Sequence, residues 1–248
     1  MLTIPLQPVC SPEQANQPAR EGGFCGLFLR PQHYDVRVTE SAVGLLAGER
    51  KFVYLKNILD PAGVALAART LPRLRFGRGR RLDETYDTYG EDMVMGYYLS
   101  PTPTKPTRRY PRTYFTVAVA LCRTFQQLLT AHWPEALASA LAQDRARIGA
   151  ELNIFSDVPP APIFSTLTLN HNVIFPAHTD SRNSEGPSAL AVFGRWVGGE
   201  LCFPRLRVAF PLEPGDVLLA DTRGEQHGNV GPLIGTRISA VAYRVPIA

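Results

Sequence analysis

The sequence has no long apolar run and no sign of a targeting segment at its start. Its hydrophobic stretches are interrupted by proline or charge well short of the roughly 18–20 residues that a membrane-spanning helix needs. Residues 1–20 show no basic start followed by an apolar stretch. We therefore expect no secretion signal, no membrane partner and an intracellular protein, in the nucleus or the cytoplasm.

Cysteine is scarce and scattered. The chain has four, and no two form a CxxC pair: Cys10, Cys25, Cys122 and Cys202. Zinc ribbons need such pairs, and disulfide frameworks belong mainly to small secreted chains. We expect buried free thiols.

The remaining composition is that of an ordinary globular chain. The 248 residues are 45% hydrophobic and 19% charged, which supports one sizeable domain with its own core. The net charge of +4 is compatible with a polyanionic partner without demonstrating one. We expect a monomer.

The texture of the sequence changes along the chain. Residues 1–30 are rich in proline, glycine and polar residues and predict a flexible arm. Residues 31–150 mix strands and helices. Strands are expected at 34–38 and 52–55, and helices at 60–68, 114–132 and 134–148. Asp60 is the expected N-cap of the first helix, with a proline directly after it.

The C-terminal part, residues 151–248, consists of short β-rich runs separated by turn residues. The runs are 164–170, 188–193, 201–203, 208–210, 217–221 and 237–245. Many short strands at even spacing indicate a sandwich or barrel. We expect an α+β fold with one domain over 31–248, in which the two long helices pack on the sheet because they lack enough apolar partners of their own.

A His-x-Asp pair and a distant histidine indicate a metal site. His178 and Asp180 lie two residues apart, on the same side of an extended backbone, and His227 follows after several strands. Two imidazoles and one carboxylate form the facial triad that binds Fe(II) and leaves three positions open, two for a bidentate 2-oxo acid and one for O2. Zinc is the competing metal.

Arg237 and Ser239 favour the oxo acid. Both face the same way on a strand ten residues after His227, and a guanidinium with a hydroxyl suits the distal carboxylate of 2-oxoglutarate. A His-x-Asp pair alone is usually a solvated turn, and His227 alone could be a loop histidine. The ordered set on a β-rich background predicts iron and 2-oxoglutarate.

These motifs resemble a known family. The His178–Asp180 segment, residues 192–201 and 211–217, His227 and Arg237 look like the double-stranded β-helix core, a cupin-like jelly roll, of 2-oxoglutarate oxygenases. More narrowly, they are similar to the TET/JBP branch, which oxidises the methyl group of methylated pyrimidines in nucleic acids. The resemblance covers roughly residues 160–246.

The resemblance implies a role for each matching residue. It implies His178, Asp180 and His227 as iron ligands, with Arg237 and Ser239 holding 2-oxoglutarate. Asn183 matches a position that hydrogen-bonds a flipped base, although it also suits a turn. Val245 stands where such enzymes carry a histidine.

Two arginine-rich segments are candidate contacts for a nucleic-acid backbone, since an enzyme that extrudes a base must hold the phosphates around it. The candidates are Arg75, Arg78, Arg80, Arg81, Arg108 and Arg109. The alternative is a solvated surface on which these arginines pair with the acids between Asp83 and Asp92.

Three functions remain open. The first is an Fe(II)- and 2-oxoglutarate-dependent dioxygenase that oxidises a methylated nucleobase of the 5-methylcytosine type in DNA or RNA. The alternative is an oxygenase of the same fold that hydroxylates a small molecule or a protein side chain. The third is a catalytically silent binding module, which would leave the ordered set of motifs unexplained.

Overall fold

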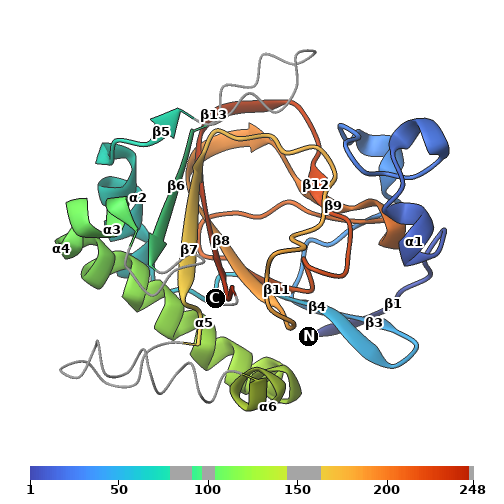
Figure 1. Cartoon of the computed structure of the whole chain (residues 1–248), viewed down its shortest axis with the longest axis horizontal. Coiled ribbons are helices and arrows are strands. Elements are labelled where there is room, and N and C mark those ends of the chain that lie inside the picture. Colours follow the sequence, from blue (N-terminus) through green and yellow to red (C-terminus); the bar gives the residue numbers. More distant parts are fainter. Residues whose placement is uncertain (79–90, 97–103, 144–162, 246–248) are drawn as a thin grey trace.

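A nine-stranded sheet forms the centre of the molecule in the computed structural model, which describes residues 1–78, 91–96, 104–143 and 163–245 (Figure 1). Its neighbouring strands are, in order, β1 (Leu2–Pro5), β3 (Ala42–Leu46), β4 (Glu49–Leu55), β11 (Val217–Ala220), β8 (Ser188–Gly198), β13 (Leu233–Tyr243), β7 (Thr166–His171), β6 (Glu91–Gly96) and β5 (Gly77–Arg78). Apart from the parallel pair β1–β3, these pairings are antiparallel.

A four-stranded sheet lies beside it, on the right in Figure 1. Its strands are, in order, β12 (Gly228–Asn229), β9 (Leu201–Phe203), β10 (Val208–Phe210) and β2 (Val36–Arg37). The predicted strands 201–203 and 208–210 coincide with β9 and β10, whereas β8 continues past its predicted end to Gly198. The fold class is therefore α+β, as predicted.

Strand alternation gives the large sheet two chemically different faces. In β7, Leu167 and Leu169 pack into the apolar core, whereas Thr168 and Asn170 line a cavity on the opposite face. The same period of two in β13 sends Ala240 to the core. In β7 the cavity-lining residues thus come from the polar half of the alternating pattern.

All the α-helices of the described residues except α1 (Pro12–Ala15) lie on the apolar face of the large sheet, where the sequence predicted the two long helices to pack (Figure 1). They are α2 (Pro61–Thr70), α3 (Lys105–Arg109), α4 (Pro111–Thr113), α5 (Val119–His132) and α6 (Pro134–Gln143), whereas α1 lies on the other side of the molecule. Asp60 caps α2 by accepting the N–H of Gly63 at 2.8 Å.

The predicted long helices differ in detail from those observed. The first is split, because a π-helical turn at Tyr114–Ala118 precedes α5. The second begins at Pro134 as predicted, and the part expected beyond residue 143 lies outside the described residues. No helix among the described residues is both long enough and apolar enough to cross a membrane.

A second core fills the space between the two sheets. Phe52 and Tyr54 of β4 meet Phe210 of β10 edge-on, with ring centroids 4.8 and 5.5 Å apart, and Phe203 of β9 lies 5.9 Å from the same ring. All four aromatic side chains are buried. This apolar contact holds the small sheet against the large one and so fixes the cavity between them.

Residues 1–30, predicted to be a flexible arm, differ from that expectation in their packing. β1 pairs with β3, and Leu6, Ala15 and Leu29 are buried. Ala177, next to His178, exchanges backbone hydrogen bonds with Gly26 and Leu27 at 2.8 Å each. Partners distant in sequence, which a local pattern does not reveal, hold this segment in place.

Candidate active site

The backbone brings His178 and His227 side by side. The two residues form an isolated antiparallel bridge in which each N–H donates to the other's carbonyl at 2.9 Å. Their imidazole centroids lie 4.4 Å apart. Asp180, two residues after His178, is held by its own N–H, which donates to the carbonyl of Thr222 at 2.9 Å. Two loops, one after β7 and one after β11, thus meet at a single point.

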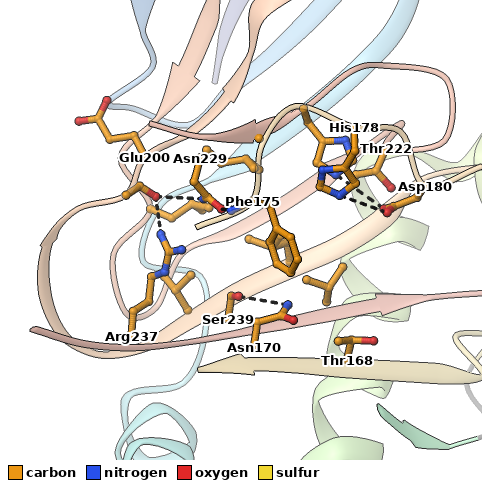
Figure 2. A pocket seen from close by; sticks show the side chains of 18 of the residues that line it. Thr168, Asn170, Phe175, His178, Asp180, Glu200, Thr222, Asn229, Arg237 and Ser239 are labelled. Atoms are coloured by element: carbon orange, nitrogen blue, oxygen red, sulfur yellow. Dashed lines mark hydrogen bonds and ion pairs between the residues drawn. The ribbon is translucent and has the colours of Figure 1, made fainter. Parts of the chain in front are cut away.

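The three side chains converge on one another. Each imidazole Nε2 lies 3.7 Å from an oxygen of Asp180, and the three possible ligand atoms all lie within 4.8 Å (Figure 2). The Nδ1 atoms are turned away: that of His178 bonds the Pro176 carbonyl at 2.8 Å, and that of His227 the Glu225 carbonyl at 3.1 Å. These bonds select the tautomer whose Nε2 lone pair faces the centre.

The burial of His227 keeps it in the form that a metal needs. Burial, assisted by the neighbouring His178, lowers the pKa of His227 to about 4. The imidazole is therefore neutral at pH 7 and can donate its lone pair. Two imidazole nitrogens and one carboxylate oxygen form a donor set that fits a divalent first-row metal.

A buried cation lies at the other end of the cavity. Arg237 on β13 is 5% exposed, and its guanidinium donates to the carbonyls of Gly199 and, at 2.7 Å, Val173. Burial lowers the pKa of Arg237 to about 10, so it stays charged at pH 7. Among the described residues no carboxylate pairs with it, which leaves a buried charge in need of an anion.

Gly199 makes room for this guanidinium. The residue has a φ of +68°, and a Cβ built on it would lie 2.6 Å from Nη1 of Arg237. A side chain here would therefore displace the arginine as well as strain the backbone. Glycine at position 199 is thus a structural requirement of the cavity.

The metal-ligand candidates and Arg237 line the same cavity, which has a volume of about 1020 Å³. Ser239 faces it two residues after Arg237, and its hydroxyl accepts a 3.5 Å hydrogen bond from the amide of Asn170. In Figure 2, Ser239, Asn170 and Thr168 follow one another along one wall, with His178 and Asp180 above them and Arg237 at the far side. The cavity can hold a dianion between the triad and the arginine.

Asn183 also lines the cavity and is 9% exposed. Its N–H donates to the Asp180 carbonyl at 2.9 Å, which closes the turn after the His-x-Asp pair. Its amide donates to the Ser188 hydroxyl at 3.3 Å, and that hydroxyl lies 2.7 Å from the hydroxyl of Thr222. Asn183 therefore belongs to a turn and also lines the cavity.

Residues 99–245 match a family described as the oxygenase domain of the 2OGFeDO superfamily, Tet_JBP. The chain belongs to this Tet/JBP oxygenase family. It is 32% identical over 234 residues to the bifunctional helicase and thymine dioxygenase JBP2 of Trypanosoma cruzi, covering 87% of this chain and 20% of that protein. The corresponding JBP2 of Leishmania infantum is 44% identical over 87 residues, 33% of this chain and 8% of that protein.

A solved structure supports the fold. The chain resembles NgTET1 in complex with 5mC DNA with a TM-score of 0.65 and 16% identity, over 90% of this chain and 84% of that one. The chain spans about a fifth of the length of the first curated relative. Membership of the superfamily implies Fe(II) and 2-oxoglutarate, and the described residues contain the His-Asp-His cluster that such a cofactor requires.

Three of the candidate arginines lie close to one another, but away from the cavity. The N–H of Arg75 donates to the hydroxyl of Tyr110 at 3.2 Å, and the Arg109 guanidinium lies 5.4 Å from the same ring. Arg108 is exposed beside it. The helices α3 and α4 lie on the helix-covered face of the large sheet, opposite the cavity (Figure 1).

The remaining arginine candidates follow Arg75 in the sequence. Arg78 lies on β5 with only its backbone described, and Arg80 and Arg81 lie outside the described residues. The predicted pairing with the acids between Asp83 and Asp92 also falls mostly on that stretch.

Asn170, Arg205 and Glu225 were not among the predicted site residues. Asn170 lies in a predicted strand, and its position two residues after Thr168, in alternation with Leu167 and Leu169, was the available signal for a polar cavity wall. Arg205 and Glu225 form a buried ion pair between residues that are distant in the sequence, and no local pattern predicts such a pair.

Proposed function

We propose that this protein is an Fe(II)- and 2-oxoglutarate-dependent dioxygenase that oxidises the methyl group of a methylated pyrimidine in DNA or RNA. The observation that supports it most is the presence, in one cavity, of a convergent His-Asp-His cluster and a buried arginine without a carboxylate partner among the described residues. The first fits a metal, the second an oxo-acid dianion.

His178, Asp180 and His227 would hold the iron, and their Nδ1 bonds to backbone carbonyls would fix the orientation of both imidazoles. Fe(II) with 2-oxoglutarate and O2 supplies the oxidant that hydroxylates a C–H bond, with succinate and carbon dioxide as the other products. With these three side chains as ligands, the remaining positions on the metal would be open to the cosubstrate.

Arg237 would bind the distal carboxylate of 2-oxoglutarate, and Ser239 would donate its hydroxyl to the same group. The guanidinium already uses two N–H groups on the carbonyls of Gly199 and Val173. This leaves it oriented before the ligand arrives, which lowers the entropic cost of binding.

The sheet arrangement supports a double-stranded β-helix core. Two sheets face each other across an aromatic layer, and the cavity opens between them. The β-rich segment 163–245 supplies the candidate metal ligands, and within the described residues no other cluster of three potential ligands converges in this way. Residues 31–150 supply the helices and edge strands that support this core.

The nucleobase as substrate rests on the relatives and on the cavity. The relatives are named thymine dioxygenases, and the structurally similar NgTET1 was solved with 5mC DNA. A volume of about 1020 Å³ accommodates a flipped base beside the cosubstrate. The burial of Val245 in place of a base-contacting histidine means that base recognition must use other groups in this chain.

The test is succinate release by iron-loaded protein with three duplexes: one containing 5-methylcytosine with uracil in place of thymine, one containing thymine, and one containing neither. Succinate stimulated by a methylated base, with the oxidised base found by mass spectrometry, supports the proposal. Succinate that is indifferent to these duplexes and also to RNA containing 5-methylcytosine contradicts the nucleobase substrate and favours a small molecule or protein side chain. An Asp180→Ala variant should release none, and strong turnover by it would overturn the metal assignment.

A further inference from the structure

Asn170 carries a buried hydrogen-bond acceptor that the described part of the protein does not satisfy. The residue is 6% exposed and its side chain faces the cavity. Its Nδ2 donates to the Ser239 hydroxyl at 3.5 Å, but its Oδ1 has no hydrogen-bond partner among the described residues. Leaving a buried acceptor unpaired is costly, so such an atom at a binding site points to a ligand.

The sheet fixes where this acceptor lies. Asn170 is paired in register with Ser239 of β13 on one side and with Asp92 of β6 on the other. Its strand neighbours Leu167 and Leu169 are anchored in the apolar core, so the strand cannot rotate Asn170 out of the cavity without exposing them. The strand register thus keeps the Asn170 side chain on the cavity face of the sheet.

Asn170 lies between the two ends of the cavity. In Figure 2 its amide nitrogen points toward Ser239, on the side of Arg237, while its oxygen points away from them toward the side of Thr168. The Thr168 hydroxyl lies 2.8 Å from that of Tyr243. The strand β13 therefore runs from Arg237 and Ser239, the proposed cosubstrate end, to Tyr243 at the other.

The chemistry of the two ligands decides which of them Oδ1 can serve. At neutral pH 2-oxoglutarate is a dianion that offers only acceptor oxygens, so a carbonyl oxygen beside it would be repelled. A pyrimidine offers a donor: thymine has its ring N3–H, and 5-methylcytosine has an exocyclic amino group. Both lie on the edge that base pairing uses and that flipping exposes.

We propose that Asn170 is a specificity-determining residue whose Oδ1 accepts a hydrogen bond from an N–H donor on the base-pairing edge of the substrate. This rests on the proposed function, since it takes the substrate to be a pyrimidine. The residue reads the donor that distinguishes an intact base from one alkylated on that nitrogen. A site built around a hydrogen bond rejects the analogue that lacks the donor, because the protein acceptor is then left unpaired.

The experiment measures wild-type protein and two Asn170 variants, each with an intact and a donor-blocked substrate. The probes are the methylated duplex that wild-type protein oxidises and the same duplex with the donor blocked, as N3-methylthymine or N4,N4-dimethyl-5-methylcytosine. The variants are Asn170→Leu, which preserves size, and Asn170→Ala, which leaves room for the added methyl groups. The quantity compared is kcat/KM for the oxidised base, and the apparent dissociation constant for 2-oxoglutarate is measured in parallel.

Wild-type protein should prefer the intact base by about 10-fold or more. Both variants should lose about 10-fold on the intact base and discriminate by only about 2-fold, while the 2-oxoglutarate constant changes by less than about 3-fold. The matched control is Asn229→Leu. Asn229 is a cavity asparagine whose amide is satisfied on both sides, by the Phe175 N–H at 3.1 Å and the Gly199 carbonyl at 3.2 Å. Its variant should keep the wild-type discrimination.

Three outcomes would overturn the inference. If wild-type protein oxidises no base, the proposed function fails and the inference falls with it. If wild-type protein oxidises the base but the Asn170 variants discriminate as strongly, only the inference fails. If the variants raise the 2-oxoglutarate constant while discrimination persists, Asn170 contacts the cosubstrate or holds water instead.

Discussion

Arg205 and Glu225 form a buried ion pair, and Glu225 lies two residues before the candidate metal ligand His227. The Arg205 Nε donates to Oε2 of Glu225 at 2.7 Å, and each side chain is 4% exposed. The backbone carbonyl of the same Glu225 accepts the hydrogen bond from Nδ1 of His227. The pair also secures the N-terminal segment, since Arg205 donates to the Cys10 carbonyl at 3.4 Å. Glu225 is thereby connected to the N-terminal segment through Arg205 and to the His227 imidazole through its own backbone carbonyl.

We expect Glu225→Gln to weaken metal binding as well as stability. Removing the charge leaves Arg205 buried without a counterion, which costs about 3 kcal/mol of unfolding free energy. Loosening the carbonyl that orients His227 should raise the dissociation constant for Mn(II) or Co(II) about 10-fold. Denaturant titration of the metal-free protein and calorimetric metal titration measure the two effects separately.

The matched control for that variant is Asp35→Asn. Arg207 pairs with Asp35 in the same two-pronged geometry only two residues from Arg205, but Asp35 is 67% exposed and the pair touches no candidate ligand. The control should cost at most about 1 kcal/mol and leave metal affinity unchanged. Equal metal affinity in Glu225→Gln and wild-type protein would show that the pair serves stability alone.

The second prediction concerns Arg237. Replacing it with leucine removes the only charge proposed for the distal carboxylate, so the apparent Michaelis constant for 2-oxoglutarate should rise on the order of 100-fold. Arg195→Leu is the control, because Arg195 lies on the exposed rim of the same cavity and should shift that constant by less than about 3-fold. If Arg237→Leu leaves the constant unchanged, another residue holds the cosubstrate.

The third prediction concerns acid stability without metal. Burial and the nearby His178 lower the pKa of His227 to about 4, below its ordinary value of 6.5. Between these values the unfolded chain binds the proton and the folded chain does not. The unfolding free energy should therefore fall as pH drops from about 6.5 toward 4, with a limiting slope of about 1.4 kcal/mol per pH unit from this group. Denaturant titrations across this range should show a shallower slope in His227→Gln, and an equal slope would contradict the assignment.

Local patterns were enough to predict the central features of the site. The two-residue spacing of His178 and Asp180 and the strand before His227 are short-range signals, and the structure brings all three side chains together. Ser239 and Arg237 share a cavity face because a strand alternates with a period of two. The start of α2 was likewise predicted from a local signal, because Asp60 is an N-cap residue and the structure shows its capping hydrogen bond.

What the sequence could not predict depends on contacts between distant segments. The packing of residues 1–30 arises from pairing of β1 with β3 some forty residues away and from hydrogen bonds to Ala177. The unsatisfied acceptor of Asn170 follows from the register between β7 and β13, which no single strand encodes. Both features lie beyond the range of local periodicity.

The last prediction concerns the arginines across the sheet from the cavity. We expect them to contact the nucleic-acid backbone without taking part in the reaction. Replacing Arg108 and Arg109 together with alanine should weaken binding to a methylated duplex and reduce the slope of log affinity against log salt by about 2. Because the two residues lie on the helix-covered face of the large sheet, kcat at saturating duplex should not change. Fluorescence anisotropy from about 50 to 200 mM salt measures the slope.

The control is the double variant Arg20→Ala with Arg223→Ala. Both are exposed arginines that pair with neighbouring acids, and the slope for this variant should match that of wild-type protein. An unchanged slope in the Arg108 and Arg109 variant would assign these arginines to a solvated surface.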